Sequence, residues 1–227
     1  MSNHKLPKRK RFWIFLAVRI IANILIISGI VFSFFAFYPY VKQEIWYWWH
    51  AQHGEKIVAT VETKQTPKKT LPPLGVAPVD TNFGIVIEKI DVNAPIVANV
   101  DPANYHEYIA ALAKGVAQAK GTAVPGSTKS DNNNVFLFAH SAINVFEAKK
   151  YNSVFYLLRK LEVGDRVTTF YQNKRYDYIV TSKQVVEATD TRYLSQASKD
   201  PILTLQTCDP PGSSLRRLIV TAKLDEI

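Results

Sequence analysis

The chain has 227 residues, of which 47% are hydrophobic and 21% charged, and it carries a formal net charge of +9. This length allows one domain with appended segments, and the composition is ordinary for a folded protein. Six of the 28 lysines and arginines lie among the first 20 residues, where no acidic residue occurs. The basicity is therefore mostly a terminal patch, and no nucleic acid is expected as a partner.

The N-terminal region is built around a long apolar stretch. Residues 12–40 are almost wholly apolar, and residues 20–40 contain no charge. A helix of this length can cross the hydrocarbon core of a bilayer. The basic residues before the stretch predict that residues 1–11 form a cytoplasmic tail and that the chain after Tyr40 is outside. Residues 12–40 are predicted as a single transmembrane anchor.

Two other interpretations of this stretch fit less well. A cleaved signal peptide has a shorter apolar region that ends in small residues, whereas this one ends in a run of aromatic residues. A buried core helix of a soluble protein is disfavoured because the stretch is apolar on all sides and follows a block of charge.

Residues 41–80 begin with aromatic side chains and then become rich in proline, lysine and threonine. Such a stretch without apolar periodicity is typical of a linker. We therefore expect a juxtamembrane segment and linker over residues 41–80, followed by one domain over residues 81–227.

The domain is dominated by short apolar runs with β-branched residues, which predict strands. Helical spacing occurs twice, and Gly, Pro, Ser, Asp and Asn mark the loops. The expected elements are strands at 84–90 and 94–98, a helix at 104–114, a loop at 121–134, a strand at 135–139, a short helix at 154–161, a hairpin of strands 166–171 and 175–186, and strands at 201–207 and 218–224. Many short strands without alternating helices favour a mainly β fold, either a barrel or a sandwich.

Three residues with complementary chemistry lie at the ends of these strands. His140 follows the strand at 135–139, Cys208 is the only cysteine and follows the strand at 201–207, and Arg217 opens the last strand. A thiol becomes an effective nucleophile when a base such as imidazole ionises it. An arginine can stabilise the oxyanion of a tetrahedral intermediate. The residue types needed for acyl transfer through a thioester are therefore present.

The sequence from Thr204 to Cys208, followed by Arg217, resembles the TLxTC…R signature of sortases, which are membrane-anchored cysteine transpeptidases of the bacterial surface. The likeness covers about residues 83–225 and includes the segments 87–96, 121–126 and 155–165. It implies a closed β-barrel of about eight strands with short helices, preceded by one N-terminal transmembrane helix. The residues around His140 differ from the Gly-His-Arg or Gly-His-Thr run of many relatives and do not assign a subclass.

By this resemblance, Cys208 is the nucleophile, His140 is the acid and base, and Arg217 holds the oxyanion and the substrate. Arg217 is preferred to Arg216 because the family's arginine lies five residues before the alanine of the last strand, here Ala222. Adjacent strand residues also point to opposite faces, so only one of the pair should face the thiol. Further candidates for substrate or oxyanion contacts are Thr207 and Arg216.

The resemblance also implies the reaction and its location. The expected substrate is a surface protein with an LPxTG-like sorting signal, cleaved between Thr and Gly and transferred to an amine acceptor such as a peptidoglycan precursor or a pilin. The catalytic domain is expected outside the bacterial cytoplasmic membrane. No cofactor or metal is expected, and no acidic cluster can be assigned to calcium, although calcium dependence stays open.

Other functions compete with this one. A different extracytoplasmic cysteine acyl-transferase or protease is possible, but papain-like enzymes place Cys before His. An L,D-transpeptidase has a Gly-Cys-x-Arg context that the chain lacks. An inactive membrane-anchored β-barrel binding module is the non-enzymatic alternative. We expect specificity to lie in the loops 187–200 and 209–215.

Overall fold

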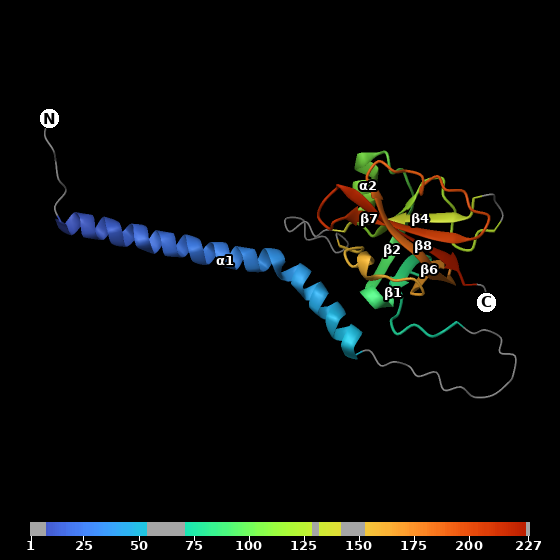
Figure 1. The fold of residues 1–227 in the computed structure, drawn as a ribbon, viewed down its shortest axis with the longest axis horizontal. Coiled ribbons are helices and arrows are strands. Elements are labelled where there is room, and N and C mark those ends of the chain that lie inside the picture. The colour runs from blue at the N-terminus through green and yellow to red at the C-terminus, as the bar shows by residue number, and fades with distance from the viewer. Residues whose placement is uncertain (1–7, 54–70, 129–131, 142–152, 226–227) are drawn as a thin grey trace. The chain divides into compact units, whose positions relative to one another are not determined.

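The structure is a computed structural model that describes residues 8–53, 71–128, 132–141 and 153–225 (Figure 1). The chain divides into two compact units, residues 1–52 and residues 53–227. Residues 1–7 of the expected cytoplasmic tail and residues 54–70 of the expected linker lie outside the described residues.

The first unit is a single long helix, α1 (Lys8–His53), which is bent along its length (Figure 1). Its window Val18–Phe35 has a mean hydropathy of 2.2, and among the described residues no other helix is long and apolar enough to cross a membrane. Pro39 lies inside α1, where proline removes a backbone hydrogen bond and favours a kink. The helix has the length and hydropathy of a single-pass anchor, and it continues past Tyr40 into the segment where a linker was expected.

The second unit is a closed barrel of eight strands, which confirms the predicted fold class. The strands follow the order β1-β2-β3-β4-β7-β8-β6-β5, and β5 pairs with β1 to close the barrel. Their bounds are β1 Phe83–Ile87, β2 Val92–Val100, β3 Val116–Ala119, β4 Asn134–Phe138, β5 Arg166–Tyr171, β6 Lys174–Glu187, β7 Ile202–Asp209 and β8 Arg216–Leu224. The helices of this unit are α2 (Tyr105–Leu112) and two short 3-10 helices, η1 (Glu88–Ile90) and η2 (Leu158–Lys160).

Strands β4, β7 and β8 lie next to one another, with β4 parallel to β7 and β7 antiparallel to β8. β4 is buried at four of its five positions and β7 at its first four, as their continuous apolar sequences predict. Leu137, Leu203 and Leu205 each have no exposed surface. The three strands that carry the predicted functional residues therefore form one rigid, well-packed part of the barrel wall.

The structure differs from the expected elements in three places. The short helix expected at 154–161 is a series of turns that ends in η2. Phe155, Tyr156, Leu157 and Leu158 are all buried, and four consecutive buried residues do not fit a helix with one apolar face. The strand expected at 84–90 ends at Ile87 and continues as η1.

The third difference is β3, which the sequence did not predict. Its residues Val-Ala-Gln-Ala have little β-propensity. β3 forms because it pairs parallel to β2 and antiparallel to β4, contacts between segments that are distant in sequence. These partners cannot be read from a local pattern.

The segment 71–80, the last part of the expected linker, is bonded to the barrel. Pro72 O accepts a hydrogen bond from Arg175 Nη1 (2.7 Å), and Gly75 N donates to Glu88 Oε1 (2.6 Å). Asn93 makes two further bonds, accepting from Val79 N (2.9 Å) and donating to Ala77 O (2.8 Å). Residues 72–79 thus form part of the folded unit rather than a free spacer.

Candidate active site

His140 and Cys208 come from the same end of two paired parallel strands. The register pairs Phe138 of β4 with Gln206 of β7. His140 and Cys208 each lie two residues further along, and a hydrogen bond from Ala139 N to Gln206 O (3.2 Å) continues the ladder beyond the end of β4. Equal offsets from a paired position place the two side chains beside each other on the same side of the sheet.

The antiparallel register of β7 and β8 places Arg217 directly across from Cys208. Residues opposite each other in an antiparallel pair project from the same face, with Cβ atoms about 5 Å apart. Arg216 is instead opposite Asp209, and its Nη2 lies 3.2 Å from Asp209 Oδ2 in an exposed ion pair. The two neighbouring arginines therefore face different sides, and Arg217 shares the face of the thiol.

A cavity of about 360 Å³ brings these residues together. Cys208, His140, Arg217 and Thr207 all line it, whereas Arg216 does not. Its other lining residues come from β4, β7 and α2 with the residues beside them, and from two connections. They are Phe136, Phe138 and Ala139; Gln206; Pro102, Tyr108, Ile109 and Leu112; Ala188, Asp190, Thr191 and Leu194 between β6 and β7; and Ser214 between β7 and β8. The cavity thus combines a thiol, an imidazole and a guanidinium with both apolar and polar side chains.

The guanidinium of Arg217 is held by backbone carbonyls. Its Nη1 donates to Ser214 O (3.1 Å) and to Arg216 O (3.0 Å). Within the described part of the chain, these contacts leave the Nε and Nη2 hydrogens of Arg217 for a ligand. A cation fixed in this way can stabilise negative charge that develops beside Cys208.

Thr207 ties the two strand ends together. Its hydroxyl donates to Ala139 O (2.8 Å), and both residues are buried. The bond joins the residue before Cys208 to the residue before His140, so it limits how far apart the two can move. Because the hydroxyl has only one hydrogen, a further donor contact from Thr207 would have to come from its backbone N–H.

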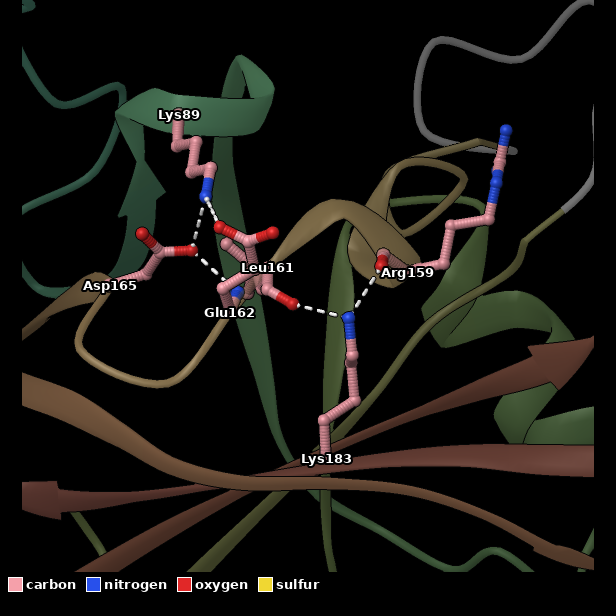
Figure 2. Close-up of polar contacts among 6 residues, drawn as sticks. All are labelled: Lys89, Arg159, Leu161, Glu162, Asp165 and Lys183. Carbon is pink, nitrogen blue, oxygen red and sulfur yellow. Dashed lines mark hydrogen bonds and ion pairs between the residues drawn. The ribbon is translucent and has the colours of Figure 1, made fainter.

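Residues 153–165, which precede β5, are bonded to other parts of the barrel. Phe155 N donates to His140 O (3.1 Å), and Phe155 is completely buried. Further along, Lys183 of β6 donates from Nζ to Arg159 O (2.9 Å) and Leu161 O (2.7 Å), as Figure 2 shows. The same figure shows Lys89 of η1 between Asp165 and Glu162, with N–O distances of 2.8 and 3.1 Å. These bonds hold residues 155–165 against the barrel.

Additional charges lie close to the site. Burial lowers the pKa of Arg159, while the negative charge of Asp209, the residue after the thiol, acts in the opposite direction. Asp190, in the cavity wall, accepts hydrogen bonds from the side chain and backbone of Arg192, and these bonds hold the pKa of Asp190 below its usual range. Asp190 is therefore ionised at neutral pH.

The sequence did not assign the wall of this cavity that α2 forms. A helix was predicted over 104–114, but nothing in its pattern indicated that Tyr108, Ile109 and Leu112 form a cavity wall. The apolar spacing of that helix was the available signal, because an apolar face needs a partner surface. The loop 187–200 was expected to carry specificity, and Ala188, Asp190, Thr191 and Leu194 line the cavity, although no periodicity indicated which of its residues would do so.

The described residues contain no group of three or more His, Cys, Asp or Glu side chains that could hold a metal ion. The site offers a nucleophile, a group that can carry a proton and a fixed cation. Together these groups can form a thioester by attack on a carbonyl, stabilise the oxyanion and protonate a leaving amine.

Comparisons with known proteins agree with this arrangement. The family model of the sortase domain matches residues 85–225. The structure resembles the lid mutant of sortase A from Corynebacterium diphtheriae, with 25% identity, a TM-score of 0.52 and coverage of 65% of this chain and 72% of the other. Sortase C-1 from Actinomyces oris matches with 25% identity, a TM-score of 0.53 and coverage of 66% and 76%.

A third solved structure, the sortase D5 transpeptidase of Clostridium perfringens, matches with 26% identity, a TM-score of 0.50 and coverage of 66% and 82%. A search of curated proteins found no match. The family model spans more than half of the chain, and its range contains His140, Cys208 and Arg217. With the barrel topology and the structural matches, this shows that the chain belongs to the sortase family.

Proposed function

We propose that the protein is a cysteine transpeptidase that cleaves an LPxTG-like sorting signal between Thr and Gly and transfers the upstream protein to an amine. The observation that carries the proposal is the convergence of Cys208, His140 and Arg217 from three adjacent strands on one cavity. The sortase family supplies the reaction type, and the site supplies groups with suitable chemistry.

In the first step, the Cys208 thiolate attacks the carbonyl carbon of the signal's threonine. The carbonyl electrons move to the oxygen, and Arg217 stabilises the resulting oxyanion. The backbone N–H of Thr207 is a further donor for this oxygen. When the intermediate collapses, the bond to the glycine nitrogen breaks, and protonated His140 gives a proton to the leaving amine.

In the second step, an incoming amine attacks the thioester. His140 accepts a proton from this amine, the new peptide bond forms, and the Cys208 thiolate leaves. The acceptor is an amine of a peptidoglycan precursor or of a pilin subunit. No cofactor takes part in these steps.

The proposed setting is the outer face of a bacterial cytoplasmic membrane. Helix α1 would serve as the single-pass anchor, with the N-terminus inside and the barrel outside. This location would bring the barrel to exported proteins that are still near the membrane.

The proposal is tested with the purified full-length protein in detergent, a library of quenched fluorescent peptides based on LPxTG, and an amine acceptor. We expect cleavage with formation of the peptide–amine product for the wild-type protein, and none for Cys208→Ala or His140→Ala. Cleavage that is unchanged in Cys208→Ala would contradict the proposal.

A further inference from the structure

The connection between β6 and β7, residues 188–201, forms part of the cavity wall although it contains no helix or strand. Ala188, Asp190, Thr191 and Leu194 all line the cavity. Irregular segments of this kind are commonly mobile unless other parts of the protein bind their backbone groups. The contacts that hold this wall therefore determine whether it is ordered before a peptide binds or becomes ordered only during binding.

Asn134, the first residue of β4, holds the centre of the connection. Its side chain is completely buried, and its Nδ2 donates to Tyr193 O (3.0 Å) and Gln196 O (3.5 Å). These two carbonyls flank Leu194, which lines the cavity. The amide thus fixes the backbone on both sides of a residue that faces the substrate cavity.

The Asn134 amide is itself held from the other side. Its Oδ1 accepts a hydrogen bond from Thr204 Oγ1 (2.9 Å), and Thr204 is also completely buried. With the oxygen bound to a hydroxyl, the orientation of the amide is set and Nδ2 must face the connection. Buried polar groups that are fully paired act as rigid, specific contacts.

The neighbouring Asn133 makes a comparable contact at the far end of the same connection. Its Nδ2 donates to Lys199 O (2.8 Å), and its backbone N donates to Ser198 O (2.8 Å). Neither Ser198 nor Lys199 lines the cavity. Asn133 therefore provides a matched comparison, because it is a buried asparagine that holds the same connection outside the cavity wall.

We propose that Asn134 is a positioning residue that keeps the wall formed by residues 188–194 in its binding shape before the substrate arrives. The inference rests on the proposed function, because the ligand of this wall is the sorting peptide. A preformed wall avoids the ordering cost of binding. If the wall were formed in only a fraction of molecules, the apparent affinity would fall by that fraction.

The test uses the double variant Asn134→Leu/Thr204→Val of the full-length protein in detergent. Both replacements are close in shape, and together they leave no buried polar group unpaired between β4 and β7, while the connection loses its two donors. Thr204→Val alone keeps the two bonds from Asn134 Nδ2 and serves as the matched control. Asn133→Leu removes the side-chain donor to Lys199 O, at the outer end, together with the acceptor of the Ser127 hydroxyl.

We expect the double variant to raise KM for the sorting peptide by about tenfold, with kcat within about threefold of wild type. Alkylation of Cys208 by iodoacetamide should be unchanged, since this small reagent does not need the wall. Thr204→Val and Asn133→Leu should keep KM near the wild-type value. A double variant with unchanged KM, or with reduced kcat and slowed alkylation, would overturn the inference.

A second measurement needs neither turnover nor a variant. Amide hydrogen exchange of the wild-type protein should show protection of Leu194 and Ser195, whose N–H groups bond to Thr191 O, before any peptide is added. Rapid exchange that becomes protected only with peptide bound would overturn the inference. Failure of the wild-type protein to react with any sorting peptide would contradict the proposed function instead, and exchange compared between wild type and the double variant would still decide the role of Asn134.

Discussion

Arg217 differs from Arg216 in one respect that matters for chemistry, the side of the strand from which it projects. Arg217 lies across from Cys208 and lines the cavity, whereas Arg216 pairs with Asp209 and is exposed. The guanidinium of Arg217 uses Nη1 for two carbonyls, which orients its remaining donors. A lysine offers a point charge on a flexible stem and lacks this planar arrangement of donors.

We expect Arg217→Lys to lower kcat for sorting-peptide cleavage by about 100-fold, the size seen when an oxyanion donor is lost. Arg216→Lys is the matched control and should change kcat by less than about threefold, because an exposed ion pair contributes little. Steady-state kinetics on both variants measures the difference. A larger loss in Arg216→Lys than in Arg217→Lys would show that the arginine on the other face interacts with the substrate.

For single residues, much of the candidate site could be predicted from the sequence. The strict alternation of side chains along a strand favoured one arginine of the pair, and strand ends indicated where His140 and Cys208 would lie. The contact of Thr207 with Ala139 could not be predicted, because it joins residues that are 68 positions apart. The role of Asn134 was hidden for the same reason, since its partners lie 59 to 70 positions away.

Among the elements, residues 153–165 before β5 are bonded by a side chain from another strand. The buried residues of this segment form turns and η2 rather than a helix. Lys183 of β6 binds two of these carbonyls, those of Arg159 and Leu161 (Figure 2). A lysine near the end of a helical turn satisfies carbonyl groups that the turn itself leaves unpaired.

We expect Lys183→Met to lower the free energy of unfolding by about 1 kcal/mol, because it keeps the aliphatic stem but removes the donor. Lys174→Met, in the same strand near the hairpin, is the control and should be close to neutral. Urea unfolding followed by circular dichroism measures both. Equal stability of the two variants would mean that the bonds from Lys183 are replaced by water without loss.

The sequence predicted this segment as a helix because its apolar residues recur at compatible spacing. The segment has too many consecutive apolar residues for one face of a helix, since Phe155, Tyr156, Leu157 and Leu158 are all buried. Local periodicity records which residues are apolar, but it does not show how many surfaces are available to cover them. The same limit applies to β3, whose strand pairing depends on β2 and β4.

Across the whole second unit, one buried carboxylate connects the barrel wall to the segment that precedes it. The Asp177 side chain has no exposed surface and accepts hydrogen bonds from Arg166, Arg175 and Thr168. Arg175 also donates to Pro72 O. Burial alone would raise the pKa of Asp177, but the hydrogen bonds from Arg175, Arg166 and Thr168 outweigh it and hold the pKa below the ordinary value of 3.8.

This lowered pKa makes stability depend on pH in a defined direction. The folded state binds the proton more weakly than the unfolded chain, so the stabilisation is complete above pH 3.8 and is lost as the pH falls through the lower folded pKa. At neutral pH, Asp177→Asn should cost about 2 kcal/mol, given that the two arginines remain partly exposed to water. Urea unfolding at several pH values should show this difference shrinking below pH 3.8. A difference that stays constant down to strongly acidic pH would contradict the assignment.

The contacts of residues 72–79 also bear on where the folded unit begins. A fragment that starts at residue 80 loses the bonds to Arg175, Glu88 and Asn93, whereas one that starts at residue 71 keeps them. We expect the shorter fragment to melt several degrees lower, since about 1 kcal/mol shifts Tm by roughly 2–4 °C at this size. Equal melting temperatures in a calorimetric comparison would show that the segment adds no stability.

At the scale of the molecule, the sequence predicted the class of fold and the long apolar helix, because both depend on composition and short-range pattern. It did not predict where α1 ends or that the residues before β1 bond to the barrel. The composition of residues 71–80 is that of a linker, but its hydrogen bonds to Glu88, Asn93 and Arg175 tie it to the barrel.

The central claim is that Cys208 forms a thioester with a sorting peptide in a cavity shared with His140 and Arg217. The most direct measurement is intact-mass spectrometry of the full-length protein, quenched in acid during reaction with an LPxTG peptide in the absence of an amine acceptor. We expect a mass increase equal to the peptide up to its threonine, located on Cys208 by fragmentation, removed by adding an amine and absent in Cys208→Ala. Cleavage of the peptide without any adduct on Cys208, together with full activity of Cys208→Ala, would contradict the claim.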